Sequence, residues 1–397
     1  MKTHFYIARR YLFSKSGNNA INNIIAIASL GVVIVSAAFI IVLSGFSGIR
    51  TFNLDLIKLT DPELKILPKK HKNFIFSDSL SHILSNEKYI ENYSKILEEK
   101  VFINFENKQK IAKLKGVDSN YYKIIRLDTL VFMGNTPQPM TSELMIGMTL
   151  ANDLSFTLST NEIQSIDIMV PKPGKGIITD PRKSFNEKYF FPVGVFQTSA
   201  DFDQMYLYTN IGAVQKLLSY PNNRISSIEI KSKNPQYIES LKKSLQKKLD
   251  NKFIVKNRKD QNPLIFKMLN NENLMTYLVL SLILLLALFN ITGSIMMIII
   301  NKKSNIITLQ QLGLNFFDIK KIFLIQGFGM TSISGVIGLI IGLVLVIWQL
   351  KFPFLYIPQT TMAYPVELHL YNILWVLLTI TVMGLISTYV AVRSLRI

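Results

Sequence analysis

Four long runs without a charged residue constrain the fold of this chain more than any other feature. They are Ala20–Gly48, Leu274–Ile300, Ile322–Leu350 and Tyr371–Val392. A bilayer core of ~30 Å is crossed by about 20 apolar helical residues, and each run supplies at least that. The composition agrees, because 49% of the 397 residues are hydrophobic. The sequence therefore predicts a membrane protein with four transmembrane helices.

The first run is predicted to remain in the protein as a membrane anchor. Its apolar stretch is longer than that of a signal peptide. It also ends in Ser44–Gly48, which offers no convincing small-residue cleavage site.

Positive charges outside the runs predict which connections face the cytoplasm. The net charge is +18. Apart from the long 49–270 segment, the basic residues cluster at the two ends and between the second and third runs. They are Lys2, Arg9, Arg10, Lys15, Lys302, Lys303, Lys320, Lys321, Arg393 and Arg396, and the short 351–370 connection has only Lys351. Because short cytoplasmic loops are rich in Lys and Arg, both termini and the 301–321 loop are predicted to be cytoplasmic. A basic extracytoplasmic domain beside anionic lipid explains the remaining surplus without nucleic acid.

Together these features predict a membrane α-helical fold with a large α+β extracytoplasmic domain inserted between helices 1 and 2. The predicted parts are a cytoplasmic amphipathic helix (1–19), helix 1 (20–48), the extracytoplasmic domain (49–270), helix 2 (271–300), a cytoplasmic loop (301–321), helix 3 (322–350), a short outer loop (351–370) and helix 4 with its tail (371–397). Residues 4–16 interleave aromatic and basic side chains, which suits a helix lying on the membrane surface. A basic flank that only orients the first span fits equally well. The second and third runs exceed the bilayer core, so they are predicted to tilt or to continue as a stalk.

Residues 49–270 are long enough for a soluble domain with its own core, and we expect two lobes. Several short runs are typical of strands: Leu64–Leu67, Val101–Phe105, Lys110–Lys115, Ile166–Val170, Tyr189–Phe196, Met205–Tyr208 and Ser227–Ile230. Residues 234–249 instead carry leucines four apart opposite lysines, which predicts an amphipathic helix. The Pro- and Gly-rich stretch Pro171–Asn186 predicts an exposed loop between two strands.

No arrangement of residues predicts catalysis. Pro-Gly-Lys-Gly at 173–176 lacks the earlier glycine and the following Ser or Thr of a phosphate-binding loop. The four histidines are scattered without metal-ligand spacing, and cysteine is absent. Asp201 and Asp203 could share one face of a strand as catalytic carboxylates or calcium ligands, but a solvated turn is the favoured interpretation. We therefore expect no catalytic, cofactor-binding or metal site in this chain.

The four apolar runs also contain no ionisable side chain. Ion-coupled carriers use buried ionisable groups as relays, so the energy for any transport is expected to come from another protein. In the third run Ser334, Gly338 and Gly342 lie four apart, beside Gly335, and such spacing lets helices approach closely. Packing within the bundle is the favoured interpretation, and a dimer interface is the alternative.

The segment NKKSNIITLQQLGLN (301–315) is neither apolar enough for a span nor polar enough for an ordinary loop. Ile306, Leu309 and Gly313 recur at helical spacing, and Gly313 is predicted to end a short helix. The apolar stripe could press onto a partner protein or rest on lipid headgroups. The pattern alone leaves both interpretations open.

The layout of the chain resembles the permeases of type VII (mechanotransmission) ABC transporters, within the FtsX/MacB-like superfamily. Several stretches in order are similar to the lipoprotein-releasing, LolC/LolE-like branch. They are FYIARRYLFSK with the first run, LKGVD (114–118), MIGMTLANDL (145–154), FPVGVFQTSADFDQMYLY (191–208), NPLIFKMLNNENLMTYL (262–278), ALFNI (287–291) and NKKSNIITLQQLGLNFFDIKKIFLIQG. The chain departs from the family pattern in two ways. Asn305 and Gln310 stand where family coupling segments usually carry an acidic residue and an arginine, and the proline usual near the end of the last span is missing around Val390.

The resemblance implies a non-catalytic permease subunit of an ATP-driven transporter in the bacterial inner membrane. Two permease chains, identical or paralogous, would pair around an apolar cavity. Two copies of a separate ATPase, which binds the ATP and magnesium, would dock under the 301–321 segments. The transporter would extract acylated lipoproteins from the outer leaflet and pass them to a periplasmic carrier. No cofactor is expected in this chain, and the other partner is membrane lipid.

The resemblance also assigns three groups of residues. The ATPase-coupling group is Lys302, Lys303, Asn305, Ile306, Leu309, Gln310 and Gly313. The lipoprotein-cavity group is Ile40, Leu43, Phe46, Phe266, Leu269, Met275 and Leu278, and structural packing is an equally good interpretation of each. The hook that holds the carrier is Pro173, Gly174, Lys175, Gly176, Ile177, Ile178 and Pro181, and a plain hairpin tip is the alternative.

Two alternatives remain. Another permease of the same superfamily would serve efflux or the regulation of cell-wall hydrolases. The efflux type usually carries a fused ATPase, and the cell-wall type has a much smaller outer domain. A membrane-anchored binding or sensor protein without a transport role is the alternative from a different class. A neighbouring gene for an ATPase supports a permease, and one for a kinase supports a sensor.

Overall fold

The computed structural model describes residues 2–13, 19–158, 164–172, 185–249, 252–357 and 362–393. The chain divides into two compact units. One consists of Met1–Asn53 and Lys267–Ile397, and the other is Leu54–Phe266. We call them the helical unit and the sheet unit.

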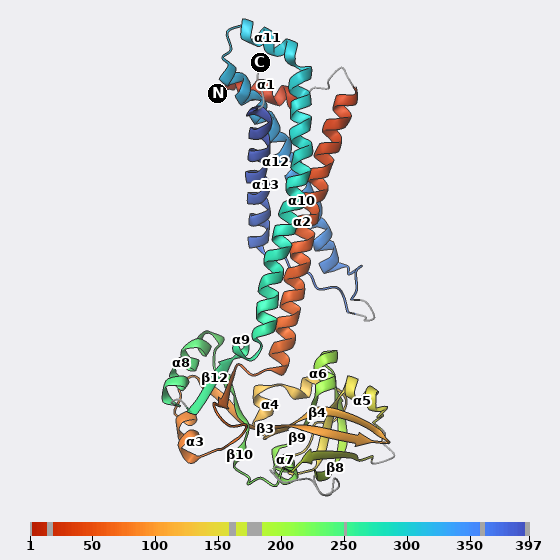
Figure 1. The fold of residues 1–397 in the computed structure, drawn as a ribbon, viewed down its shortest axis with the longest axis vertical. Coiled ribbons are helices and arrows are strands. Elements are labelled where there is room, and N and C mark those ends of the chain that lie inside the picture. Colours follow the sequence, from red (N-terminus) through yellow and green to blue (C-terminus); the bar gives the residue numbers. More distant parts are fainter. Residues whose placement is uncertain are drawn as a thin grey trace. The chain divides into compact units, whose positions relative to one another are not determined.

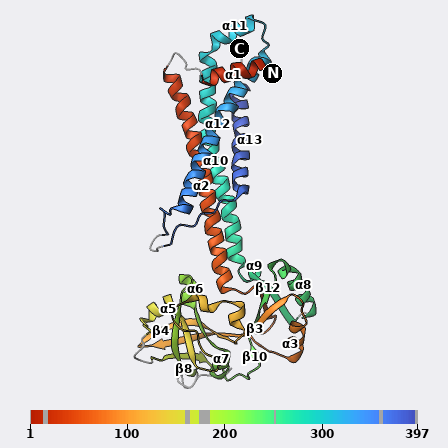
Figure 2. The ribbon, with the colours of Figure 1, turned by 180° about the vertical axis from the view of Figure 1, so that it is seen from behind.

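Four long helices lie side by side in the helical unit (Figures 1 and 2). They are α2 (Asn19–Thr60), α10 (Pro263–Asn301), α12 (Phe316–Lys351) and α13 (Leu370–Arg393). All four are long and apolar enough to cross a membrane, which confirms the predicted transmembrane helices. Two shorter helices, α1 (Lys2–Phe13) and α11 (Lys303–Gln311), complete this unit.

The helices α2 and α10 are much longer than the apolar runs that they contain. α2 has 42 residues and α10 has 39, which at 1.5 Å per residue is about 63 and about 58 Å, against ~30 Å for a bilayer core. The polar residues after Gly48 contain no helix breaker, so α2 continues until the Asp61–Pro62 pair. A residue before proline is pushed out of the helical region, and α2 ends there.

A ten-stranded mixed sheet forms the sheet unit, with its strands in the order β12-β1-β11-β3-β4-β9-β6-β8-β5 and with β7 paired to β3 and β8. Its strands are β1 (Leu64–Pro68), β3 (Ile90–Phe105), β4 (Lys108–Val117), β5 (Val131–Gly134), β6 (Glu143–Gly147), β7 (Ile166–Pro171), β8 (Phe185–Phe196), β9 (Tyr206–Asn210), β11 (Ser227–Ser232) and β12 (Phe253–Asn257). β2 (Phe74–Ile75) and β10 (Arg224–Ile225) form a separate pair. The pairs β4–β9 and β6–β8 are parallel, and the other pairs are antiparallel.

Helices cover the sheet and bury two main apolar cores. α5 (Met148–Leu154) and α7 (Ile211–Leu217) pack with β3, β4, β6, β7, β8 and β9. α3 (Asp78–Ser85) and α8 (Ile238–Lys248) pack with β1, β11 and β12. The long strand β3 contributes to both cores. The shorter helices are α4 (Tyr121–Ile124), α6 (Ala200–Met205) and α9 (Arg258–Gln261). The α+β fold class is thereby confirmed.

Each of the seven predicted strand runs lies in a strand or overlaps one, and the predicted amphipathic helix is α8 with its preceding 3-10 turn. The prediction for Asp201 and Asp203 was wrong. Both lie on α6 rather than in a solvated turn, and Asp203 is buried. Its carboxylate accepts hydrogen bonds from the backbone N–H of Thr198 at 2.9 Å and from the Thr198 hydroxyl at 2.7 Å. It therefore fixes the chain between β8 and α6.

Glycines on α12 let it pack closely inside the helical unit. A Cβ added to Gly338 would lie 2.2 Å from the Val33 carbonyl oxygen, and one added to Gly342 would lie 2.2 Å from the Ile40 side chain. A Cβ on Gly335 would meet Ile380 of α13 at 2.5 Å. The small residues of the third run therefore pack against neighbouring helices of the same chain, as the favoured interpretation predicts.

This packing predicts that Gly338→Ala destabilises the bundle. The added methyl group must displace the backbone of α2, and overpacking of this kind costs about 1–3 kcal/mol. Gly293→Ala on α10 is the matched control, because a Cβ there meets nothing within 4 Å. Thermal unfolding of both purified variants in detergent checks the expectation. Equal melting temperatures for the two variants would contradict it.

Candidate functional site

One end of the helical unit gathers three segments that the sequence places far apart. In both views α1, α11 and the C-terminal end of α13 lie at the same end of the bundle (Figures 1 and 2). α1 packs on α12, and the rings of Tyr11 and Phe323 lie 6.3 Å apart between centroids. Most of the basic clusters identified in the sequence therefore belong to one end of the bundle.

Gly313 ends α11 through its backbone conformation. Its φ is +93°, in the left-handed region that favours glycine. The N–H of Gly313 donates to the carbonyl of Gln310, and the N–H of Leu314 donates to that of Leu309. This pair of hydrogen bonds is a Schellman motif, which satisfies the last carbonyls of the helix. The structure agrees with the prediction that the helix ends here.

The side chain of Ile306 points into the chain's own core. It is 1% exposed and belongs to the same buried cluster as Ile319, Phe323 and Ala391. An apolar side chain already buried by its own chain is not available to a partner protein. The role of Ile306 as a direct contact is therefore corrected, because its side chain is buried in the core of the helical unit.

Other apolar residues at this end of the bundle are exposed to solvent. Leu312 is 74% exposed and Phe317 is 75% exposed, and Ile307 is also exposed. We call these three residues the exposed apolar face. Of the remaining predicted coupling residues, Lys303 and Asn305 are exposed, and Lys302, Leu309 and Gln310 are half-buried. Periodicity found the apolar stripe, but it could not tell which side of α11 the rest of the bundle covers.

The predicted cavity residues fall into two groups. Ile40, Leu43 and Leu269 are buried, and Phe46 and Phe266 are half-buried. Met275 and Leu278 are exposed, at 61% and 52%, on α10. In a single chain only these last two present a free apolar surface.

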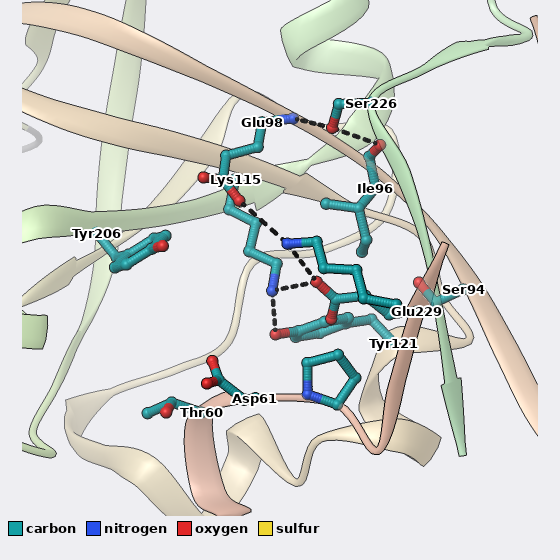
Figure 3. Close-up of polar contacts among 12 residues, drawn as sticks. Thr60, Asp61, Ser94, Ile96, Glu98, Lys115, Tyr121, Tyr206, Ser226 and Glu229 are labelled. Carbon is teal, nitrogen blue, oxygen red and sulfur yellow. Dashed lines mark hydrogen bonds and ion pairs between the residues drawn. The ribbon is translucent and has the colours of Figure 1, made fainter. Parts of the chain in front are cut away.

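A buried ion-pair cluster in the sheet unit escaped the sequence analysis. Lys115 on β4 and Glu229 on β11 lie 2.8 Å apart between Nζ and Oε1, with side chains 5% and 0% exposed. The Lys115 ammonium also donates to the hydroxyl of Tyr121 at 3.0 Å. Lys65 on β1 lies 3.5 Å from Glu229 and 3.8 Å from Glu98 on β3. Figure 3 shows Lys115, Glu229 and Tyr121 of this cluster. Four strands and α4 therefore meet at one charge cluster.

Electrostatic interactions within this cluster shift the pKa values of Lys115 and Glu98 more than burial does, and in the opposite direction. Burial alone would lower the pKa of Lys115, but Glu229, Tyr208 and Glu98 carry it well above its usual range. Burial would raise the pKa of Glu98, but Lys65, Lys115 and Lys113 hold it below its usual range. Lys115 therefore stays charged in the interior. Removing Lys115 would leave the Glu229 carboxylate buried, with only its longer contact to Lys65 among the described residues.

The segment that follows α2 is tied to the segment that precedes α10. The Arg258 Nε–H donates to the Asp61 carbonyl at 3.0 Å, and the Gln261 amide donates to the Pro62 carbonyl at 3.2 Å. The Asn262 amide donates to the Asp61 carboxylate. Figure 3 also draws Asp61 beside Tyr121 and the charge cluster. We call these contacts the clasp. With the β1–β12 pairing, the clasp fixes the end of α2 and the start of α10 to the same edge of the sheet.

The predicted hook residues, from Pro173 to Pro181, lie outside the described residues. The strands on either side of that stretch are described, and they pair as an antiparallel hairpin, with Val170 opposite Asn186. On this hairpin Asp167 of β7 and Glu187 of β8 are close. Burial and the neighbouring Glu187 raise the pKa of Asp167 to about 7.

This raised pKa predicts that the hairpin loosens as pH rises. The usual pKa of the carboxyl is 3.8, so the folded state holds the proton more tightly than the unfolded chain does. The stabilisation is full below about pH 4 and is lost as pH rises through about 7. Hydrogen exchange of residues 166–171, corrected for intrinsic rates, is expected to show less protection at about pH 8 than at about pH 5. Asp167→Asn is expected to remove this difference, and an equal decline in both proteins would contradict the assignment.

Comparison with known proteins supports the resemblance found in the sequence. The chain is 27% identical to the lipoprotein-releasing system transmembrane protein LolC of Buchnera aphidicola subsp. Schizaphis graminum, over 97% of this chain and 94% of that protein. It is 22% identical to LolE of Haemophilus influenzae, over 87% of this chain and 82% of that protein. Residues 277–397 match the family described as FtsX-like permease C-terminal. The predicted similarity to LolC/LolE-like permeases is thereby confirmed.

Solved structures also align with part of the chain. The periplasmic region of MacB from Actinobacillus actinomycetemcomitans covers 53% of this chain and 94% of its own length, with a TM-score of 0.36 and 16% identity. The extracellular domain of the noncanonic ABC-type transporter YknZ from Gram-positive bacteria covers 49% and 99%, with a TM-score of 0.35 and 13% identity. At these scores neither likeness carries a conclusion about this chain.

Proposed function

We propose that this LolC/LolE-like permease, with its FtsX-like C-terminal domain, is the transmembrane subunit of an ATP-driven transporter that releases lipoproteins from the bacterial inner membrane. The observation that carries the proposal is the similarity to LolC over 97% of the chain. The chain itself supplies no catalysis. It extracts acylated lipoproteins from the outer leaflet and passes them to a periplasmic carrier.

A separate ATPase supplies the energy, and it binds at the end of the bundle where α11 lies. The apolar runs contain no ionisable side chain, so an ion gradient has no relay to act on. Extraction of an acyl chain costs about 0.8 kcal/mol for each CH₂, which requires an external source of energy. Two ATPase copies, holding ATP and magnesium, dock on the exposed apolar face and on Lys303 and Asn305 of two paired permease chains.

Movement passes along α2 and α10. Both helices are continuous over 42 and 39 residues, so neither has an internal break that would absorb a displacement. The clasp joins the segments beyond their ends, and the charge cluster holds the strands that follow. We infer that the clasp makes the end of α2 and the start of α10 move together. Met275 and Leu278, which are exposed on α10, contribute to the apolar cavity between the two permease chains.

Co-purification with lipid analysis tests this function. The chain is expressed with the ATPase encoded beside it and purified in mild detergent. We expect both proteins to copurify with triacylated lipoprotein, and addition of ATP to release the lipoprotein. An ATPase that copurifies without lipoprotein would indicate another permease of the superfamily. A chain that binds no ATPase would contradict the transport role.

A further inference from the structure

The helical unit carries a groove that the proposed function does not use. It has a volume of about 510 Å³ and is lined by residues of α1, α2, α10 and α12, among them Tyr11, Ala26, Ile298 and Met330. Ligand pockets typically have volumes of about 300–1,000 Å³. None of the predicted cavity residues lines this groove.

A buried amide oxygen without a hydrogen-bond partner among the described residues lies in the wall of the groove. Gln326 of α12 is 5% exposed, and its side-chain oxygen has no hydrogen-bond partner among the described residues. Met330 and Ser334 follow it at intervals of one turn and line the same wall. An unpaired amide is costly in apolar surroundings, so a ligand that pairs with it would bind there preferentially. A half-turn of the amide exchanges its oxygen and nitrogen, so Gln326 can either accept or donate.

A positive charge lies at the end of the groove nearest α11. The backbone N–H of Lys302 donates to the carbonyl of Ile298, so Lys302 follows that lining residue by one helical turn. Its ammonium lies 5.6 Å from the ring centroid of Tyr11, which also lines the groove. The groove therefore combines an apolar wall, an amide and a cation.

We propose that this groove binds a phospholipid of the surrounding bilayer. One acyl chain lies along the apolar wall, an ester carbonyl accepts a hydrogen bond from the N–H₂ of the Gln326 amide after its half-turn, and the phosphate lies near Lys302. The occupant is a lipid because the walls belong to membrane-spanning helices and the charge at the mouth complements a phosphate. The site would fix α1 against α2 and α12, at the end where α11 also lies.

Native mass spectrometry of the full-length chain, purified without an ATPase and titrated with phosphatidylglycerol, tests the site. Ala26→Trp fills the groove and is expected to weaken binding at least about tenfold. Ile27→Trp is the matched control, because Ile27 is 71% exposed and does not line the groove. Gln326→Met keeps the size of the side chain and is expected to weaken binding about fivefold, the loss expected for one hydrogen bond.

Two results would overturn the site. In the first, Ala26→Trp binds phosphatidylglycerol as tightly as wild type and Ile27→Trp do. In the second, Ile337→Cys, in a chain that has no cysteine of its own, forms a disulfide-linked dimer in membranes, which would mean that a second copy covers the groove. Because no ATPase is present, failure here leaves the proposed transport function standing. Loss of ATPase binding would equally leave the lipid site standing.

Discussion

Replacing Leu312 and Phe317 together with aspartate is expected to abolish ATPase binding while the chain stays folded. Both side chains are about three-quarters exposed, so the substitutions leave no cavity and bury no charge in the isolated chain. In the complex each aspartate would be desolvated in an apolar contact. Loss of two interface hot spots, at about 2 kcal/mol or more each, weakens binding by a factor on the order of a thousand. Binding of the purified ATPase to the chain in nanodiscs measures this.

Two controls separate docking from folding. Met140→Asp makes the same change of charge at a residue that is 94% exposed in the sheet unit, and it is expected to bind the ATPase normally. Ile306→Asp is expected to lower the yield of folded chain, because it puts a carboxylate into an apolar cluster. If the folded Leu312/Phe317 double variant binds the ATPase as tightly as wild type, the exposed apolar face is not the docking site.

The second large effect is expected from Lys115→Met in the sheet unit. This substitution leaves the Glu229 carboxylate fully buried, with only Lys65 nearby at 3.5 Å. Removing one partner of a buried ion pair typically lowers the free energy of unfolding by about 3–5 kcal/mol. Lys65 remains to compensate in part, so we expect about 3 kcal/mol. Hydrogen exchange of β4 and β11 in the full-length chain reports the loss.

A second substitution tests the cause of that loss. In Lys115→Met/Glu229→Leu no charge is left unpaired, and an apolar pair of similar volume often restores stability. The double variant is therefore expected to regain most of the protection. Lys113→Met removes a lysine that is 30% exposed, and we expect a change below about 1 kcal/mol. Unchanged exchange in Lys115→Met would show that Glu229 does not depend on Lys115.

Local patterns predicted the elements of the fold better than they predicted its contacts. The four spans follow from composition alone, because a bilayer sets a minimum length for an apolar helix. The extension of α2 to Thr60 was not predicted, because polar residues continue a helix until something ends it. The Asp61–Pro62 pair is the available signal for that end.

In the candidate site, too, the sequence predicted local structure better than contacts between distant residues. Helical periodicity identified Ile306 and Leu309 and the end of α11 at Gly313. It could not show that Ile306 is buried in the same cluster as Phe323 and Ala391, which lie distant from it in the sequence. Lys115 and Glu229 are separated by more than a hundred residues. Their pairing depends on β3 lying between β4 and β11, and sequence periodicity carries no information about strand order.

We propose above that this chain releases lipoproteins when a separate ATPase acts on it. The most direct measurement uses proteoliposomes that contain the chain, its ATPase and a triacylated lipoprotein, with ATP and a soluble carrier added. We predict that lipoprotein leaves the vesicles in an ATP-dependent manner, and that the Leu312/Phe317 double aspartate variant releases none. Release at the same rate without ATP, or no release by an assembled and ATP-hydrolysing complex, would contradict the account.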